Sequence, residues 1–73
     1  MTIETYLHLL GEMEAHEQAA LVALVQQENS RAGVAFVKRS LGLEIREAVA
    51  FHLYFRLMVT AITEYEASKP VSA

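Results

Sequence analysis

Residues 43–67 read LEIREAVAFHLYFRLMVTAITEYEA, and this stretch decides the fold. Its apolar residues recur three and four positions apart, which is the spacing of one face of an α-helix and not the alternation of a strand. One side of the expected helix is an apolar arc made of Ala48, Ala50, Phe51, Tyr54, Phe55, Met58, Ala61, Ile62 and Tyr65. The sequence therefore predicts one long helix that presents an apolar surface over about half of its circumference.

The opposite side of the same helix is also largely apolar. Its apolar residues are Val49, Leu53, Leu57 and Val59, and the narrow polar strip that remains is formed by His52, Arg56, Thr60 and Thr63. A helix that is apolar nearly all round is normally buried. A chain of 73 residues is too short to enclose it, and small domains without disulfides or metals often obtain the missing cover from a partner. We therefore expect a homodimer or higher oligomer, most simply a two-fold bundle with the C-terminal helices at its centre.

Two further helices are expected before this one, so the chain is predicted to be all-α, with three helices per chain in the order long, short, long. The first runs from about residue 3 to 28, with Thr2 as its N-cap and Gly11 as its weak point, because Gly in a helix interior is unfavourable. Asn29 and Ser30 suit helix caps better than helix interiors. They predict a break between the first and second helices.

Gly42 and Pro70 predict the ends of the second and third helices. A Gly directly after an apolar segment is typical of a left-handed residue, and here it ends the short helix expected over residues 31–40. The residue before a proline avoids the α region, so the last helix should stop just before Pro70. Residues 1–68 are expected to form a single helical domain, and residues 69–73 a flexible C-terminal tail.

The composition excludes several classes of protein. Hydrophobic residues make up 53% of the chain, with only three Gly and one Pro, which excludes a disordered chain. The absence of Cys excludes disulfide frameworks, thiolate nucleophiles and cysteine-bound metal centres. No Ser or Thr is spaced with a base and an orienting acid, and no glycine-rich phosphate loop occurs. The sequence therefore predicts a protein that is not an enzyme and uses no cofactor.

Charged residues argue against a membrane span within the apolar segment 43–62. The ionisable residues in that segment are Glu44, Arg46, Glu47, His52 and Arg56. Each charge near the middle of a bilayer helix would cost roughly 2.5 to 3.5 kcal/mol. The first four residues show no positive region ahead of an apolar core, so we expect no secretory signal and a cytoplasmic location.

His8, Glu12 and His16 form a weak candidate metal site. They are spaced four residues apart, which places them along one face of a continuous helix. Imidazole nitrogens and a carboxylate suit zinc or iron. A metal- or cofactor-binding bundle is therefore one alternative, although the plainer interpretation is a solvated polar face.

A second alternative is a nucleic-acid-binding regulator that uses Arg31, Lys38 and Arg39. These residues would form a basic patch around the short helix and the turn that follows it. The net charge of −3 opposes binding to phosphate groups. Nucleic acid is therefore not the expected partner.

The function that these observations favour is binding to another protein, as an adaptor, an inhibitor or an assembly or regulatory factor that works as a homodimer. The oligomer or partner interface is expected at Val49, Phe51, Leu53, Phe55, Met58, Val59 and Ile62. An exposed acidic face is expected at Glu12, Glu14 and Glu17. Such a face would steer a basic partner toward the protein.

Overall fold

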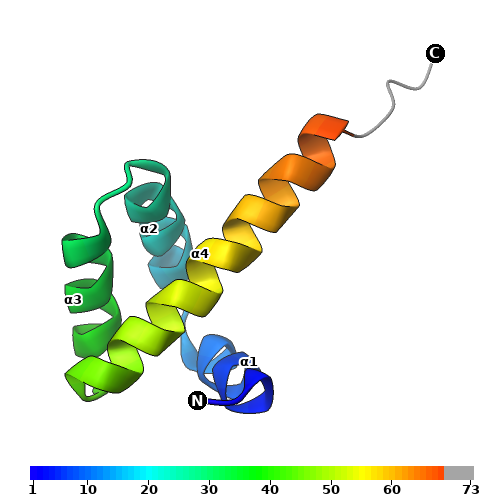
Figure 1. Ribbon diagram of the computed structural model, residues 1–73. Helices are drawn as coiled ribbons and strands as arrows, with labels where there is room; N and C mark the ends of the chain where they lie inside the picture. Colours follow the sequence, from blue (N-terminus) through cyan, green and yellow to red (C-terminus); the bar gives the residue numbers. More distant parts are fainter. Residues whose placement is uncertain (69–73) are drawn as a thin grey trace.

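The computed structural model describes residues 1–68, which form four α-helices joined by short turns (Figure 1). The helices are α1 (Ile3–Glu12), α2 (Ala15–Gln26), α3 (Ser30–Leu41) and α4 (Ile45–Ser68). The prediction of an all-α fold is confirmed, since none of the residues from 1 to 68 lies in a strand. The predicted tail, residues 69–73, lies outside the described residues.

The single helix predicted over residues 3–28 is wrong, because the chain breaks between α1 and α2. The break is at Met13 and Glu14, which are both extended, and Gly11 stays inside α1. The Glu14 amide donates to Glu17 Oε1 at 3.1 Å, which caps the start of α2. The Gln18 side-chain amide donates to the carbonyls of Leu10 and Met13, each at 3.1 Å, and so satisfies the end of α1. Polar side chains after the break, and not a glycine before it, therefore create the fourth helix.

The other helix ends agree with the sequence predictions. Thr2 caps α1 by accepting from the Thr5 amide at 3.1 Å, and Asn29 caps α3 by accepting from the Ala32 amide at 3.2 Å. Gly42 is left-handed, with φ of 64°, and ends α3. The short helix and the long final helix therefore begin and end within two residues of their predicted bounds.

The turn after α2 contains a left-handed residue that is not a glycine. Glu28 has φ of 57°. The Glu28 amide donates to the Val25 carbonyl at 3.0 Å, and the Asn29 amide donates to the Leu24 carbonyl at 3.1 Å, which is the Schellman pattern of helix ends. A side chain at a left-handed position costs roughly 1–2 kcal/mol. The turn between α2 and α3 is therefore strained at Glu28.

We predict that Glu28→Gly raises the free energy of unfolding by about 1 kcal/mol, because it relieves the left-handed strain. The matched control is Gln27→Gly, which replaces a neighbour with an ordinary φ of −81° and should lower stability. Urea unfolding followed by circular dichroism measures both changes. A Glu28→Gly variant less stable than the parent would contradict the assigned strain.

The core contains side chains from all four helices, and its aromatic members come from α1 and α4. It consists of Tyr6, Met13, Leu21, Val25, Val37, Ala48, Phe51 and Phe55. The Tyr6 ring centroid lies 5.0 Å from that of Phe51 and 5.2 Å from that of Tyr54. The Tyr6 hydroxyl also donates to the Met58 sulfur at 3.4 Å. Tyr6 therefore holds α1 against α4.

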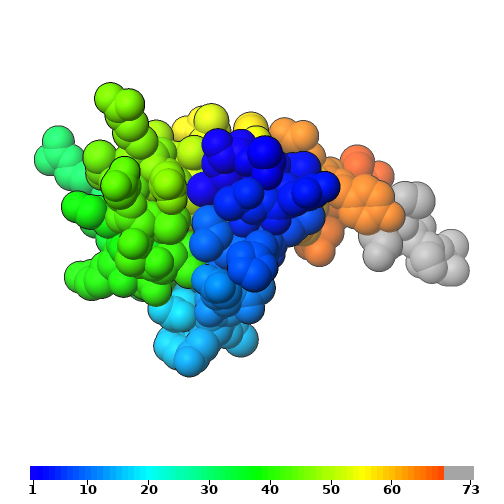
Figure 2. Space-filling model, turned by 90° about the horizontal axis from the view of Figure 1, so that it is seen from below, coloured from blue at the N-terminus to red at the C-terminus, as the bar shows by residue number. Residues whose placement is uncertain are grey.

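The fourth helix is twice as long as any helix that packs against it. It has 24 residues, about 36 Å, whereas α1, α2 and α3 have 10 to 12. All of its buried residues, Ala48, Phe51, His52 and Phe55, lie in its first half, and residues 60–68 are exposed. Its C-terminal half extends beyond the other helices (Figures 1 and 2). No helix within residues 1–68 has both the length and the apolar character needed to cross a bilayer.

Candidate functional site

An exposed row of aliphatic side chains runs along the side of α4 that faces away from the core. The row consists of Ile45, Val49, Leu53 and Leu57, which are 55%, 50%, 48% and 56% exposed. A spacing of four residues places neighbouring side chains one helical turn apart on adjoining positions of the surface. We call these four residues the outer row. Contiguous apolar surfaces of this kind are typical of binding sites.

A second exposed apolar surface lies on the C-terminal half of α4. The face of α4 that packs against the core in its first half remains apolar in its second half, where no other helix covers it. Ile62 is 51% exposed and Tyr65 is 68% exposed, while Met58 and Val59 are half-buried against the core. We call residues 58–68 the overhang.

The overhang forms one wall of an apolar groove, and α2 forms the other. The groove has a volume of about 270 Å³ and is lined by Val22, Phe55, Met58, Val59 and Ile62, with Gln18, Gln26, Thr63 and Glu66 among its polar lining residues. The space between α2 and the overhang is not filled by side chains of this chain. The groove therefore offers apolar side chains of two helices to a partner, as grooves that receive amphipathic helices do.

The structure separates the residues of the predicted interface. Phe51 and Phe55, at 0% and 1% exposed, belong to the core of the chain itself. Val49 and Leu53 lie in the outer row. The other three, Met58, Val59 and Ile62, lie on the overhang. Only the exposed and half-exposed residues of that set are available to a partner.

Two members of the outer row were not in the predicted interface. Ile45 and Leu57 complete a regular series with a period of four residues. That period was visible in the sequence, but the helix is apolar on so many sides that the pattern does not show which side faces the core. The arrangement of α1, α2 and α3 decides it.

The Lys and Arg residues of the described chain are confined to its last two helices. Residues 1–29 contain five Glu and no Lys or Arg. The Lys and Arg residues of the described chain, Arg31, Lys38, Arg39, Arg46 and Arg56, all lie on α3 and α4. Within residues 1–68 the ion pairs involve only histidines, so none of these five cations has a carboxylate within 4.0 Å. The cations on α3 and α4 are therefore available to a partner of opposite charge.

Two of the three basic residues of the nucleic-acid alternative line one hollow. Arg31 and Lys38 line a shallow hollow of about 500 Å³ together with Val34, Ala35 and Ile45. Arg39 is exposed and does not line this hollow. The hollow therefore combines two cations with an apolar floor that continues into the outer row.

The candidate metal residues His8, Glu12 and His16 are not brought together. His8 Nε2 lies 3.4 Å from Glu12 Oε1 on α1, but His16 is on α2 and its Nδ1 lies 3.2 Å from Glu14 Oε2. The expectation of one continuous face was wrong because α1 ends at Glu12. Residues 1–68 contain no cluster of three His, Cys, Asp or Glu side chains that could hold a metal ion.

The predicted acidic face has one member with a structural role. Glu12 and Glu14 are exposed, whereas Glu17 is half-buried and accepts the hydrogen bond from the Glu14 amide. This bond stabilises the charged carboxylate and lowers the pKa of Glu17 below its ordinary value. Glu17 therefore holds the start of α2 and remains ionised.

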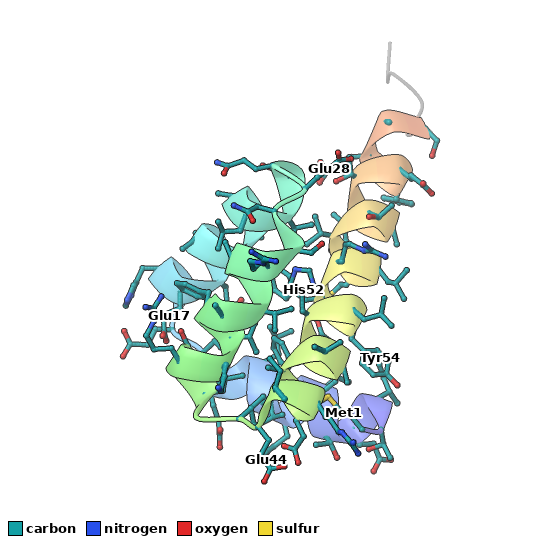
Figure 3. All side chains as sticks on the ribbon, turned by 60° about the vertical axis from the view of Figure 1, so that its left-hand side comes forward. Met1, Glu17, Glu28, Glu44, His52 and Tyr54 are labelled. Atoms are coloured by element: carbon teal, nitrogen blue, oxygen red, sulfur yellow. The ribbon has the colours of Figure 1, made fainter. Side chains whose placement is uncertain are left out.

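A polar hollow of about 490 Å³ lies between the α2–α3 turn and α4. It is lined by Val25, Glu28, Asn29, Ser30, His52, Arg56, Leu57 and Thr60. Figure 3 shows His52 between α3 and α4, and Glu28 at the turn. The strained Glu28 and the buried His52 therefore share one hollow, which also brings Arg56 of α4 near the start of α3.

His52 is buried in this hollow without a partner for one of its nitrogens. The residue is 5% exposed, and its Nε2 atom has no hydrogen-bond partner among the described residues. Burial, and then the positive charge of Arg56, lower the pKa of His52 below its ordinary value. The imidazole is therefore neutral near pH 7. It acts as a packing group there and not as a cation.

Gly33 is the point where α3 comes closest to this imidazole. A Cβ atom added at Gly33 would lie 2.5 Å from His52 Nε2, which is too close for any side chain. Gly33 itself is buried. The contact between α3 and α4 therefore depends on a glycine facing a histidine.

Comparisons with known proteins find no relative of this chain: no family model, no curated protein and no solved structure matches it.

We predict that acid destabilises the protein through His52. The unfolded chain binds a proton near pH 6.5, but the folded chain resists it, so stability should fall as the pH falls below about 6.5. Urea unfolding at pH 7.5 and pH 5.5 should show a smaller loss in His52→Gln than in the parent. His8→Gln, at an exposed histidine, is the matched control and should lose as much stability as the parent. Equal losses in the parent and in His52→Gln would contradict the role of His52.

We predict that Gly33→Ala lowers the free energy of unfolding by about 1–3 kcal/mol, because the added methyl group overpacks the contact with His52. Gly11→Ala is the matched control. It has nothing within 4 Å of the new methyl group and should raise stability by about 1 kcal/mol through helix propensity. Thermal unfolding measures both. If Gly33→Ala stabilised the protein as Gly11→Ala does, the close contact would be wrong.

Proposed function

We propose that this protein is a non-enzymatic protein-interaction module that works as a homodimer. The observation that carries the proposal is the overhang, where an apolar helix face continues past the helices that cover it. No residue of α4 after Phe55 is buried, although Met58, Ile62 and Tyr65 continue the same face. Leaving this face in water forfeits the hydrophobic stabilisation that burial would provide.

A second copy of the chain is the occupant that fits the groove between α2 and the overhang. The groove has an apolar lining, and the overhang is a helix of about three turns with one apolar face. In a two-fold arrangement each copy supplies both the groove and the helix that fills it, so one surface satisfies both chains. The C-terminal halves of the two α4 helices then lie at the centre of a bundle.

The charges on the overhang favour an antiparallel arrangement. The overhang carries Glu64 and Glu66 and, up to Ser68, no Lys or Arg. A parallel pair would place these carboxylates beside their own copies, which is unfavourable. In an antiparallel pair the two-fold axis is perpendicular to the helices, and here it passes near Ile62. Each of these carboxylates then lies beside uncharged residues of the partner.

We predict that Ile62→Asp weakens the dimer by about 100-fold or more, because each copy would place a carboxylate in an apolar interface. The matched control is Leu53→Asp, which alters a residue of equal exposure in the outer row and should leave the dimer intact. Light scattering during gel filtration over a range of concentrations gives the mass of each variant, and circular dichroism verifies that each one is folded.

Two outcomes would contradict the proposed dimer. One is a parent protein that remains a monomer at millimolar concentration. The other is loss of the dimer in Leu53→Asp with a normal dimer in Ile62→Asp, which would move the interface to the outer row.

A further inference from the structure

The outer row is flanked by two arginines, neither of which has a carboxylate of residues 1–68 within 4.0 Å. Arg46 lies near the start of the row on the side of α1, since it lines a hollow with Met1, Thr5 and Glu47. Arg56 lies near the end of the row on the other side, since it lines the hollow at Glu28, Asn29 and Ser30. The aliphatic side chains therefore run diagonally between two guanidinium groups.

The surface of α3 extends this pattern beyond Ile45. The shallow hollow between α3 and the start of α4 has Val34, Ala35 and Ile45 as its apolar lining and Arg31 and Lys38 as its cations. Apolar side chains at the centre and cations at the edge are thus found on both helices. This anatomy, an apolar centre with a charged rim, is that of a protein-binding surface.

We infer that the outer row binds an acidic amphipathic helix of a partner protein. The apolar face of that helix covers Val49, Leu53 and Leu57, and carboxylates on its two flanks meet Arg46 and Arg56. This inference rests on the proposed function, because it names the partner of the interaction module. It uses the side of α4 opposite the proposed dimer interface, so the two sites are free to act at the same time.

The geometry of the row sets the length and direction of the partner helix. From Ile45 to Leu57 the row extends about 18 Å and winds about 120° around α4, since each step of four residues turns 40° past a full circle. A straight helix follows such a row only by crossing α4 obliquely, as when i, i+4 ridges of two helices interlock at about −50°. A partner helix of three to four turns is long enough to cover the row and reach both arginines.

Other classes of macromolecule fit the outer row less well. Helices that lie on membranes carry Trp, Phe or Leu on one face and a strongly charged opposite face, whereas the side of α4 opposite the outer row is apolar and packs in the core. Single-stranded nucleic acid is held by aromatic stacking and a continuous cationic groove, but here aliphatic residues separate the cations. An acidic helix uses both the apolar row and the charges beside it.

The test uses two synthetic probe peptides of twenty residues, labelled with a fluorophore. Both carry Leu at the i, i+3, i+4 and i+7 positions of one helix face and Ala on the opposite face. Their flanking positions are Glu in the acidic probe and Lys in the basic probe. Because the chain has a net charge of −3, non-specific attraction favours the basic probe. Tighter binding of the acidic probe would therefore show that local cations, and not the net charge of the chain, determine which peptide binds.

We predict that the acidic probe binds at least ten-fold more tightly than the basic probe in fluorescence anisotropy at about 50 mM salt. Its affinity should fall in 500 mM salt, because the charges are exposed. The double variant Arg46→Glu/Arg56→Glu should reverse the preference between the probes, and Leu53→Ser should weaken the acidic probe about ten-fold. Arg39→Glu is the matched control, since it reverses an exposed cation that does not border the row, and it should retain the preference.

Failure of this inference is distinguishable from failure of the proposed dimer. Ile62→Asp should abolish dimer formation and leave the affinity for the acidic probe unchanged. Leu53→Ser should leave the dimer intact and weaken binding of the acidic probe. Equal affinity for the two probes would overturn the inference. So would stronger binding to phosphatidylglycerol vesicles or to a single-stranded RNA oligonucleotide than to the acidic probe. The parent protein could instead form filaments at high concentration that are absent in Arg46→Glu/Arg56→Glu. That result would also overturn the inference, because it would show that the outer row binds a second copy of the chain.

Discussion

The structure depends on a mismatch in length between α4 and the helices that cover it. A helix of 24 residues packs against helices of 10 to 12, so its first half has a core and its second half does not. The apolar face does not end where the cover ends, because Ile62 and Tyr65 continue it in the same direction as Phe55. The apolar face of α4 is therefore only partly covered within the chain, and we propose that a second copy covers the rest.

The same helix is also apolar on its far side, and this explains how one short chain has two separate surfaces. The overhang is acidic, and the outer row has Arg46 and Arg56 beside it. The proposed occupants differ accordingly: a second copy for the apolar face of the overhang, with its carboxylates kept apart by an antiparallel arrangement, and an acidic helix for the outer row. The contact between Gly33 and His52 fixes α3 against α4 and so holds the cations of α3 beside the start of the outer row.

Much of the fold could be predicted from the sequence, because most helix ends depend on local chemistry. Thr2, Asn29 and Gly42 each act within a few residues of their own position, and all three were recognised. The break at Met13 and Glu14 is not predicted, because the side chain that caps it is Glu17, which follows Glu14 by three residues. Glu17 belongs to a polar patch that resembles a solvated helix face.

The candidate site was harder to predict, because it depends on which side of α4 is covered. Phe51 and Leu53 are equally apolar in sequence, and only the packing of α1, α2 and α3 makes one of them core and the other surface. The polar hollow at His52 could not be found either, since it joins residues from the α2–α3 turn and from α4. Helix ends depend on residues a few positions apart in the sequence. The exposed side of α4 and the hollow at His52 depend instead on how whole helices pack against one another.

Amide hydrogen exchange along α4, followed as a function of protein concentration, tests the central claim most directly. If a second copy covers the overhang, the amides of residues 60–68 become protected at high concentration and lose that protection on dilution, while those around Phe51 stay protected throughout. Fast exchange of residues 60–68 at every concentration would contradict the claim, because it would show that the C-terminal half of α4 has no partner.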